Sequence, residues 1–143
     1  MNKYLIILII FGLIIGGGFF YSKFIKSEES KPIETGAVKN FTMVAKKNEW
    51  RFVPDQIEVE QGDKVNITIT NEDGYDHGMT IEAFGINQRI PARSTIKVSF
   101  VATQVGDFTY FCSVPCGEGV VNGEKRGHFD QFGKITVRPI QSQ

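Results

Sequence analysis

The chain has 143 residues, with 16 lysines and arginines against 16 aspartates and glutamates, so its formal net charge is +0 at neutral pH. A neutral chain without a basic stripe of interleaved aromatic residues is not expected to bind nucleic acid. The sequence contains only 2 cysteines. Two cysteines do not fix the redox compartment, because small disulfide-stapled domains usually carry more.

The chain begins with an apolar segment. No charged residue interrupts the nineteen positions from Tyr4 to Ser22, whereas Lys3 precedes them and Lys23 follows. As a helix this run would span roughly 28 Å at about 1.5 Å per residue, close to the hydrocarbon thickness of a bilayer. We therefore expect residues 1–22 to form a single-pass membrane anchor. A cleaved signal peptide is the alternative, since Gly16–Gly18 offer the small residues of a cleavage site.

The next segment, residues 23–38, is predicted to be a linker. It is polar, contains the series Ser27-Glu28-Glu29-Ser30-Lys31-Pro32, and shows no apolar period. Residues 39–143 remain for a single domain, which is long enough to bury one hydrophobic core.

Beyond residue 40 the hydrophobic period is two, as in half-buried β-strands. The alternation runs through residues 41–45, 56–60, 64–70, 95–100, 108–112 and 135–137. Turn-forming sequences such as Gln61-Gly62-Asp63 and Val105-Gly106-Asp107 separate these segments. No segment has a convincing helical period, so the pattern predicts an all-β sandwich or barrel of seven or eight short strands.

All cysteines and histidines of the chain occur in the order His77, Cys112, Cys116, His128. Thiolates with imidazoles favour copper or zinc over magnesium or calcium. Cys112 ends a predicted strand and Cys116 follows four residues later, so both sulfurs can lie on one side of a tight turn. Because a thiolate has more than one lone pair, each can bridge two metals, with one imidazole for each metal. The pattern predicts a thiolate-bridged copper pair that transfers electrons.

The loop between the cysteines offers a further weak ligand. Pro115 favours an extended conformation at Val114, which could direct the Val114 carbonyl oxygen toward a metal. Two alternatives stay open on the residues alone. Cys112 and Cys116 could form a strained disulfide, or the four side chains could form a closed zinc site.

Four stretches of the sequence resemble the cupredoxins, and among them the dinuclear copper A domains of cytochrome c oxidase subunit II and nitrous oxide reductase. They are WRFVPDQIEVEQGDKVNITITNED at 50–73, HGMTI at 77–81, FCSVPCGEG at 111–119 and HFDQFGKITV at 128–137. CSVPCG is specific, because an ordinary blue-copper domain has one ligand cysteine. The resemblance implies a Greek-key β-sandwich in which Cys112 and Cys116 are bridging thiolates, with further ligands at His77, His128 and the Val114 carbonyl.

The sequence departs from that family in two places. The family's second histidine usually follows the second cysteine by four residues, where this chain has Val120; His128 comes eight residues later. We expect Val120–Gly127 to be an inserted hairpin turning at Asn122-Gly123, which a surface loop accommodates at low cost in free energy. Gln131 stands where the family has methionine. Its amide oxygen would be a weak axial ligand that stabilises the oxidised state, or it does not bind and leaves the site one weak ligand short.

The resemblance implies a membrane-anchored, extracytoplasmic electron-transfer protein with two copper ions. It would catalyse no reaction alone and would pass electrons to a redox partner, either a cytochrome or the core of a terminal oxidase. The alternatives are a copper chaperone or storage protein, a mononuclear cupredoxin, and a metal-free interaction module stapled by Cys112 and Cys116. A Met- or His-rich tail would favour copper delivery, and Arg138–Gln143 contains neither residue.

Overall fold

The computed structural model describes residues 2–4, 6–7, 10–13 and 36–140. The chain divides into two units, Met1–Lys31 and Pro32–Gln143, and each is described by itself. In the first unit, residues 3–4, 6–7 and 10–13 are helical. The rest of the predicted anchor and the predicted linker up to residue 35 lie outside the described residues. Within the described ranges, no helix is both long enough and apolar enough to cross a membrane.

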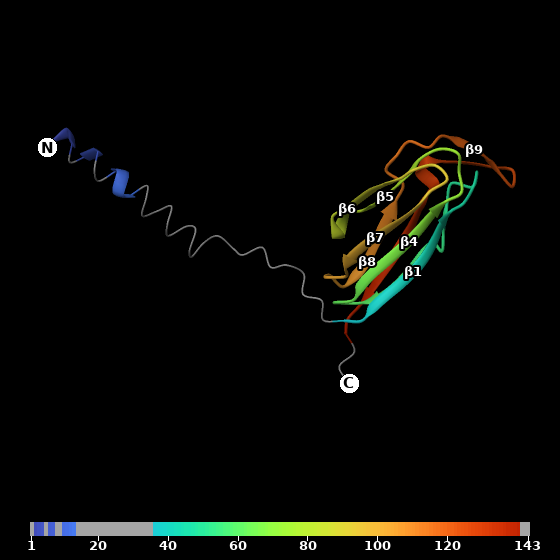
Figure 1. Ribbon diagram of the computed structural model, residues 1–143, viewed down its shortest axis with the longest axis horizontal. Helices are drawn as coiled ribbons and strands as arrows, with labels where there is room; N and C mark the ends of the chain where they lie inside the picture. Colours follow the sequence, from blue (N-terminus) through green and yellow to red (C-terminus); the bar gives the residue numbers. More distant parts are fainter. Residues whose placement is uncertain (1, 5, 8–9, 14–35, 141–143) are drawn as a thin grey trace. The chain divides into compact units, whose positions relative to one another are not determined.

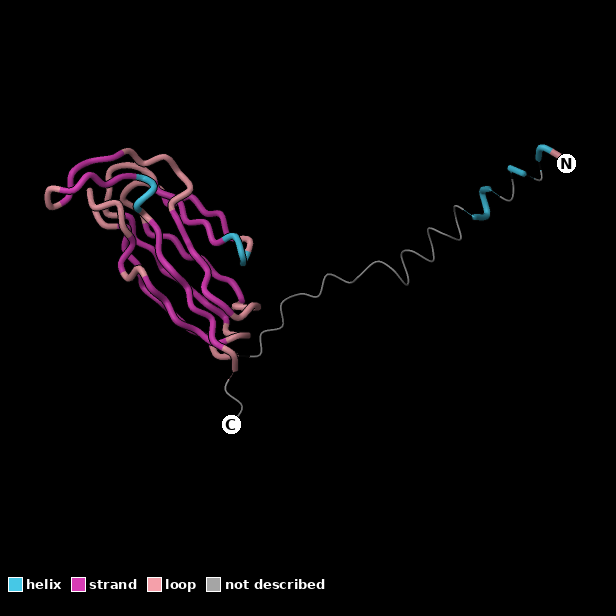
Figure 2. The backbone as a smooth tube through the Cα atoms, turned by 180° about the vertical axis from the view of Figure 1, so that it is seen from behind, coloured by secondary structure: helices cyan, strands magenta, loops and turns pink. Residues whose placement is uncertain are grey.

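The second unit consists of strands and two short 3-10 turns, as Figures 1 and 2 show. In chain order its described elements are β1 (Val38–Ala45), β2 (Phe52–Val53), β3 (Gln56–Glu60), β4 (Lys64–Asn71), β5 (His77–Ile81), η2 (Glu82–Phe84), β6 (Ile86–Ile90), β7 (Thr95–Val101), β8 (Gly106–Phe111), β9 (Glu118–Val121), β10 (Glu124–Gly127), η3 (His128–Asp130) and β11 (Phe132–Arg138). The prediction of an all-β domain is confirmed.

Alternation of side chains explains most of these strands. In β4, every second residue is buried, and Val65, Ile67 and Ile69 have no exposed surface. Strands β5 and β6 were not predicted from alternation, for opposite reasons. All five residues of β5 are buried, so both of its faces are covered and no alternation is visible. In β6 three consecutive residues, Asn87 to Arg89, are exposed.

The strands form two sheets and a separate two-stranded ribbon. One sheet has the order β2-β1-β4-β7, the other has the order β3-β11-β8-β5-β6, and the ribbon is formed by β9 and β10. Strands β1 and β4 are parallel, as are β3 and β11, and the remaining pairs are antiparallel. Parallel pairing of β1 with β4 and of β3 with β11 requires long connections, so these contacts join segments that are distant in the sequence.

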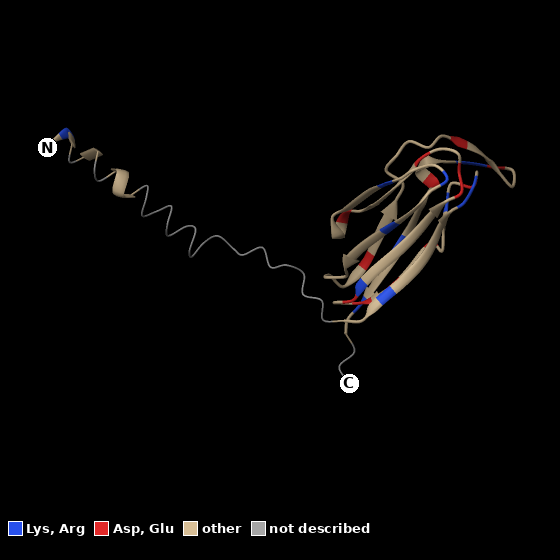
Figure 3. Cartoon of the chain, viewed as in Figure 1, with Lys and Arg blue, Asp and Glu red and all other residues tan. Residues whose placement is uncertain are grey.

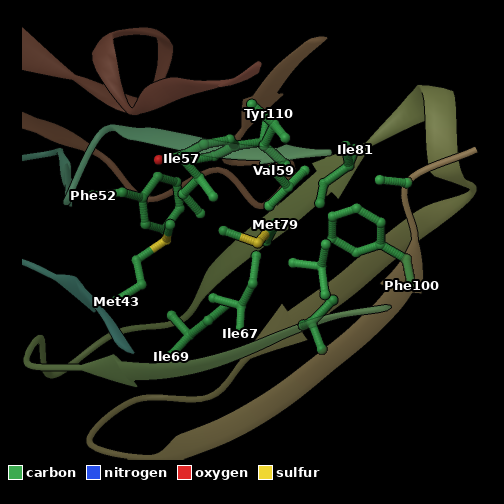
Figure 4. Packing of buried hydrophobic residues seen from close by; sticks show 14 of the residues in the cluster. Met43, Phe52, Ile57, Val59, Ile67, Ile69, Met79, Ile81, Phe100 and Tyr110 are labelled. Atoms are coloured by element: carbon green, nitrogen blue, oxygen red, sulfur yellow. The ribbon is translucent and has the colours of Figure 1, made fainter. Parts of the chain in front are cut away.

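The hydrophobic core lies between the two sheets (Figure 4). Met43, Ile67 and Ile69 come from the first sheet and meet Met79 and Tyr110 from the second. Met79 has no exposed surface, so it is a core residue. The core fixes the relative position of the sheets and therefore of the loops at their ends.

Strand pairing brings distant segments to one end of the second sheet. Phe111 at the end of β8 pairs with Phe132 at the start of β11, and it also pairs with Thr80 in β5. Cys112 directly follows β8, and His77 begins β5. Because β8 is antiparallel to both neighbours, the chain that continues beyond Phe111 runs toward the first residues of β5 and β11. The candidate ligands therefore collect at the end of the sandwich remote from the start of β1 and the end of β11 (Figure 1).

The predicted insertion is a hairpin, and its turn is at the predicted residues. Asn122 has φ 52° and Gly123 has φ 86°, a pair of positive values that suits a two-residue hairpin turn. At the base of the hairpin Gly127 pairs with Glu118, and the His128 amide donates a hydrogen bond of 3.0 Å to the Gly117 carbonyl. The chain therefore returns to its starting point, and His128 is brought back toward the cysteines.

Charged residues of both signs are distributed over the strands and loops of the second unit (Figure 3). Several of them form surface ion pairs, including Lys134 with Asp107 at 3.4 Å and Lys125 with Glu118 at 2.9 Å. This mixture differs from the basic stripe that a nucleic-acid interface requires.

Candidate metal centre

The two cysteine sulfurs lie side by side in a buried position. Cys112 Sγ and Cys116 Sγ are 3.7 Å apart, both cysteines are free, and their residues are 3% and 6% exposed. The tight loop that joins them turns both side chains to the same side. Two sulfurs at this separation can contact the same metal ion.

One imidazole nitrogen faces each sulfur. His77 Nδ1 is 3.8 Å from Cys112 Sγ, and His128 Nδ1 is 3.6 Å from Cys116 Sγ. The donor atoms of His77, Cys112 and Cys116 lie within 4.8 Å of one another. The structure thus brings together all four side chains of the sequence pattern, although β5, the loop after β8 and η3 supply them separately.

A buried carboxylate holds the ring of His77. Asp73 Oδ2 lies 2.8 Å from His77 Nε2, and both side chains are buried. Asp73 Oδ1 accepts a hydrogen bond of 2.8 Å from the Asn48 amide, which fixes the carboxylate from a second direction. When the protonated Nε2 donates a hydrogen bond to Asp73, the unprotonated Nδ1 keeps a free lone pair on the side of the sulfurs.

Sequence reasoning did not identify Asp73. Asp76, the residue directly before His77, is nearer to the histidine in the sequence. The Asp76 carboxylate instead accepts a hydrogen bond of 2.8 Å from the Ala92 amide and pairs with Arg89. The segment Asn71–Asp76 offers two aspartates before the histidine, and only the conformation of the loop decides which one reaches the ring.

Backbone groups complete the surroundings of Cys112. Its Sγ lies 3.2 Å from the Val114 carbonyl oxygen and accepts a hydrogen bond of 3.3 Å from the Gly78 amide. A side chain at Gly78 would meet Ser113, since a Cβ built there lies 2.4 Å from Ser113 Oγ. The close approach of β5 to the cysteine loop therefore requires glycine at this position.

Gln131 lies on the side of Cys116. Its side chain is fully buried, and its Oε1 is 3.5 Å from Cys116 Sγ, whereas its Nε2 has no hydrogen-bond partner in the part of the chain that the structure describes. Its backbone is tied to the site, since the Cys112 amide donates a hydrogen bond of 2.9 Å to the Gln131 carbonyl. All six residues that the sequence predicts as metal ligands thus have a donor atom close to one of the two sulfurs.

Trp50 covers the cysteine loop on another side. It forms a small buried cluster with Cys112 and Cys116, and its Nε1 donates a hydrogen bond of 3.0 Å to the Cys116 carbonyl. A Cβ at Gly119 would lie 2.4 Å from the indole, so the base of the inserted hairpin packs directly on this ring. The sequence alone did not predict this contact of Trp50 with Cys116, because the two residues are 66 positions apart.

The acid–base properties of the site suit a bound cation. The contact with Cys116 lowers the pKa of the Cys112 thiol, and the contact with Cys112 together with burial raises the pKa of the Cys116 thiol. Burial lowers the pKa of His77, but the contacts with Cys112 and Asp73 outweigh burial and raise it. Without a metal, the site therefore favours one thiolate and one thiol. A bound metal cation would supply the positive charge that a second thiolate needs.

An open hollow borders the site next to His128. It has a volume of ≈ 460 Å³ and is lined by Thr109, Phe111, Cys112, Ser113, His128, Phe129 and Phe132. Phe129 is 91% exposed, and the lining residues include three phenylalanines but no lysine, arginine, aspartate or glutamate. The cysteines are thus shielded from bulk water, whereas the His128 side of the site borders the surface.

Two thiolates and two imidazoles at one end of a two-sheet β-sandwich define a copper-binding, cupredoxin-like electron-transfer domain. The chain matches the cupredoxin-like domain family over residues 13–122 and belongs to that family. The matched range ends in the turn of the inserted hairpin, before His128 and Gln131. The structure, rather than the family match, brings these two residues to the site.

The chain is also similar in sequence to a known redox enzyme. The chain is 31% identical over 91 residues to nitrous-oxide reductase of Stutzerimonas stutzeri. The aligned region covers 62% of this chain and 13% of that protein, so the similarity concerns a small part of the relative.

Several solved structures share the fold. The copper-containing nitrite reductase NirK of Thermus scotoductus SA-01 is 26% identical, with 75% of this chain and 29% of that chain covered and a TM-score of 0.53. A chain of a heme-copper terminal oxidase dimer is 20% identical, with 94% and 96% covered and a TM-score of 0.55. The blue copper protein auracyanin A of Chloroflexus aurantiacus is 19% identical, with 71% and 99% covered and a TM-score of 0.56. The last two likenesses concern the fold alone.

Proposed function

We propose that the second unit binds a thiolate-bridged pair of copper ions and acts as a one-electron carrier. The observation that supports this most is the symmetry of the donors. Two sulfurs 3.7 Å apart are each faced by one imidazole nitrogen, at 3.8 and 3.6 Å. When bound, a copper pair of this kind takes up and releases one electron that both ions share. The similarity to a copper-containing nitrite reductase, at 26% identity, supports the choice of copper.

The donor types fit this assignment. The two thiolates would bridge, and the two imidazoles would be terminal ligands on opposite sides. The Val114 carbonyl and the Gln131 amide oxygen are near opposite sulfurs, at 3.2 and 3.5 Å, where each would serve as a weak ligand. The proposed ligand residues are His77, Cys112, Val114, Cys116, His128 and Gln131.

The protein's own contribution is to hold these donors in place. Asp73 fixes the ring of His77, the Gly78 amide binds Cys112 Sγ, and the Trp50 indole binds the Cys116 carbonyl. Donors that are fixed before the electron arrives need little rearrangement when the charge of the site changes. A small rearrangement favours fast electron transfer, so the chain needs no catalytic residue for this function.

The membrane and the partner are further parts of the proposal. The uncharged run from Tyr4 to Ser22 supports a single-pass anchor, with the second unit outside the cytoplasm. The relative that is a nitrous-oxide reductase supports a redox enzyme as partner, and a terminal oxidase core or a cytochrome is the expected one. Fractionation tests the anchor. The full chain should be found with membranes and the variant lacking residues 1–35 should not, and equal distribution of the two would refute the anchor.

Copper content tests the metal centre. The full chain, purified in detergent and reconstituted without oxygen, should bind two copper ions. Its oxidised form should give an electron paramagnetic resonance spectrum with hyperfine splitting from two equivalent copper nuclei. One ion per chain, or splitting from a single nucleus, would contradict the bridged pair. Absence of copper binding would contradict the function as a whole.

A mononuclear copper site is the second candidate, and one observation favours it. The donors of His77, Cys112 and Cys116 lie within 4.8 Å of one another, so these three residues suffice for a single copper ion without His128. This candidate predicts one copper per chain, whereas a chaperone or storage role with the same ligands predicts rapid loss of copper to a competing chelator.

A further inference from the structure

Two phenylalanines next to the proposed centre are exposed to solvent. Among the large hydrophobic side chains that the structure describes, Phe129 is the most exposed at 91%, and Phe132 is 56% exposed. Both line the hollow of ≈ 460 Å³ beside His128. Exposed aromatic rings that gather at one place mark a surface that another molecule covers, because aromatic anchors supply much of the binding energy of interfaces.

The exposed ring and the hollow lie next to each other on the same surface. Phe111 and Phe132 pair across β8 and β11, so their side chains lie side by side on the outer face of the second sheet, where both line the hollow. Phe129 lines the hollow too, but its ring is almost fully exposed and therefore stands at the rim. Each copy of the chain thus offers one aromatic ring that can be inserted and one aromatic hollow that can receive it.

A two-fold axis brings these two features opposite each other. In an isologous dimer both subunits use the same surface, so a ring beside a hollow on one copy meets a hollow beside a ring on the other. The residues that line the hollow include no lysine, arginine, aspartate or glutamate. Two identical faces can therefore approach each other without repulsion between like charges.

The surface on both sides of the hollow carries charges of both signs. A smaller hollow of ≈ 280 Å³ shares Phe132 with it and includes Asp55 and Lys134. A second one, of ≈ 260 Å³, shares Phe129 with it, and its charged residues are Glu118, Lys125, Arg126 and Asp130. A two-fold axis that passes between these flanks makes the first flank of one copy face the second flank of the other. Acids and bases are then available to each other, and such exposed pairs orient an interface more than they stabilise it.

We propose that two copies of this chain form a dimer in which Phe129 of each copy is inserted into the hollow of the other. His128 also lines the hollow, so the inserted ring covers the side of the site that borders the surface. The chain itself buries both cysteines, and the second copy completes the enclosure at His128. The dimer needs no copper. Its consequence for electron transfer rests on the proposed function: a redox partner that approaches His128 through this face has to displace the second copy.

Sedimentation velocity of the copper-free, reduced full-length chain in detergent measures the dimer. The wild type, Phe129→Ser and the control Val105→Ser are compared over a range of protein concentrations. Val105 is also an exposed apolar residue, but it lies directly before β8 and outside the hollow. Phe129→Ser should raise the dissociation constant of the dimer by more than about tenfold, because it removes an aromatic anchor, and Val105→Ser should leave it unchanged. Thermal unfolding checks that both variants fold.

Photo-crosslinking in membranes gives a second measurement, without detergent. The full-length chain carries benzoylphenylalanine in place of Phe129, or in place of Val105 as the control. Position 129 should crosslink to residues 109–113 or 128–132 of a second copy, as identified by mass spectrometry of the crosslinked peptides, whereas position 105 should not. The crosslink decides where the two measurements disagree, because detergent can cover an apolar surface.

Three outcomes would overturn the dimer. The first is a wild type that neither sediments as a dimer nor gives the crosslink from position 129. The second is equal dimerisation of the wild type and Phe129→Ser without that crosslink, because a contact elsewhere in the chain would then hold the copies together. The third is a crosslink from position 129 to a different protein only. None of these results bears on copper binding. Conversely, a chain that forms this dimer but binds no copper keeps the inference, whereas the proposed function fails.

Discussion

Asp73 and His77 form a buried pair in which Asp73 Oδ2 and His77 Nε2 are 2.8 Å apart. The ring of Tyr75 packs against the imidazole, with 5.3 Å between ring centroids. Burial, followed by the nearby Asp73 charge, raises the pKa of Tyr75 to about 12. The Asp73 side chain is buried between these two rings and the Asn48 amide, where it directs the histidine and is shielded from solvent.

Replacing this carboxylate should weaken copper binding. Asp73→Asn removes the charge that fixes the Nε2 proton, so Nδ1 is less well directed and less basic. Loss of such a carboxylate typically lowers metal affinity by about 10- to 100-fold. The affinity is measured by competition with a chelator of known strength. Asp76→Asn is the matched control, because Asp76 pairs with Arg89 and not with His77. Equal affinities in the two variants would show that Asp73 does not orient the ring.

Removing the second imidazole should convert the proposed pair into a single site. His128→Ala takes away the imidazole whose Nδ1 faces Cys116 Sγ at 3.6 Å, and leaves His77 in place. Copper content should fall from two ions to one, and the hyperfine splitting should come from one nucleus. Val120→Ala is the control, since Val120 is 73% exposed on β9 of the hairpin. A variant that keeps two ions and the shared spectrum would remove His128 from the ligand set.

Local patterns in the sequence predicted a large part of this architecture. Alternation predicted strands such as β4, and the Asn122-Gly123 pair predicted the turn of the hairpin, because both depend on neighbouring residues only. The cysteines and histidines indicated a metal site because these residue types are themselves metal ligands, although distant segments supply them. The ligand roles themselves remain a prediction.

Features that depend on contacts between distant segments were not predicted. The choice of Asp73 over Asp76 follows from the conformation of one loop, and the bond from Trp50 to the Cys116 carbonyl joins residues 66 positions apart. Strand β5 is buried on both faces, so it carries no alternation to detect. In each case the information lies in the packing of the sheets rather than in the local sequence.

Acid should destabilise the domain partly through Asp107. The Thr136 hydroxyl donates a hydrogen bond of 2.6 Å to Asp107 Oδ1, and this bond, with a smaller effect of Lys134, lowers the pKa of the carboxyl. The unfolded chain then binds a proton more tightly than the folded one. The resulting stabilisation is present above the unfolded pKa, about 3.9, and is lost as the pH falls toward the lower folded value.

Two variants test this prediction. Asp107→Asn should make the free energy of unfolding decrease less steeply as the pH is lowered below about 4, because the side chain at position 107 no longer titrates. Thr136→Val removes the hydroxyl donor but leaves the carboxyl in place. It should also reduce the pH dependence of the free energy of unfolding in this acidic range. The measurement is urea unfolding of the copper-free protein across a series of pH values. An unchanged slope in both variants would mean that Asp107 titrates alike in the folded and unfolded chain.

The contact between Gly119 and Trp50 should link the inserted hairpin to the metal centre. A Cβ at Gly119 would lie 2.4 Å from the indole, whose Nε1 binds the Cys116 carbonyl. Gly119→Ala therefore has to push the ring or the hairpin away, and overpacking of this kind costs about 1–3 kcal/mol. Unfolding in urea measures the loss. Because the indole holds the cysteine loop, the variant should also lose copper to a chelator faster than the wild type. Gly74→Ala is the control, since its Cβ would meet only Arg93 Nη2 at 3.9 Å. If Gly119→Ala lowers stability but leaves copper loss unchanged, the hairpin contributes to the fold without supporting the site.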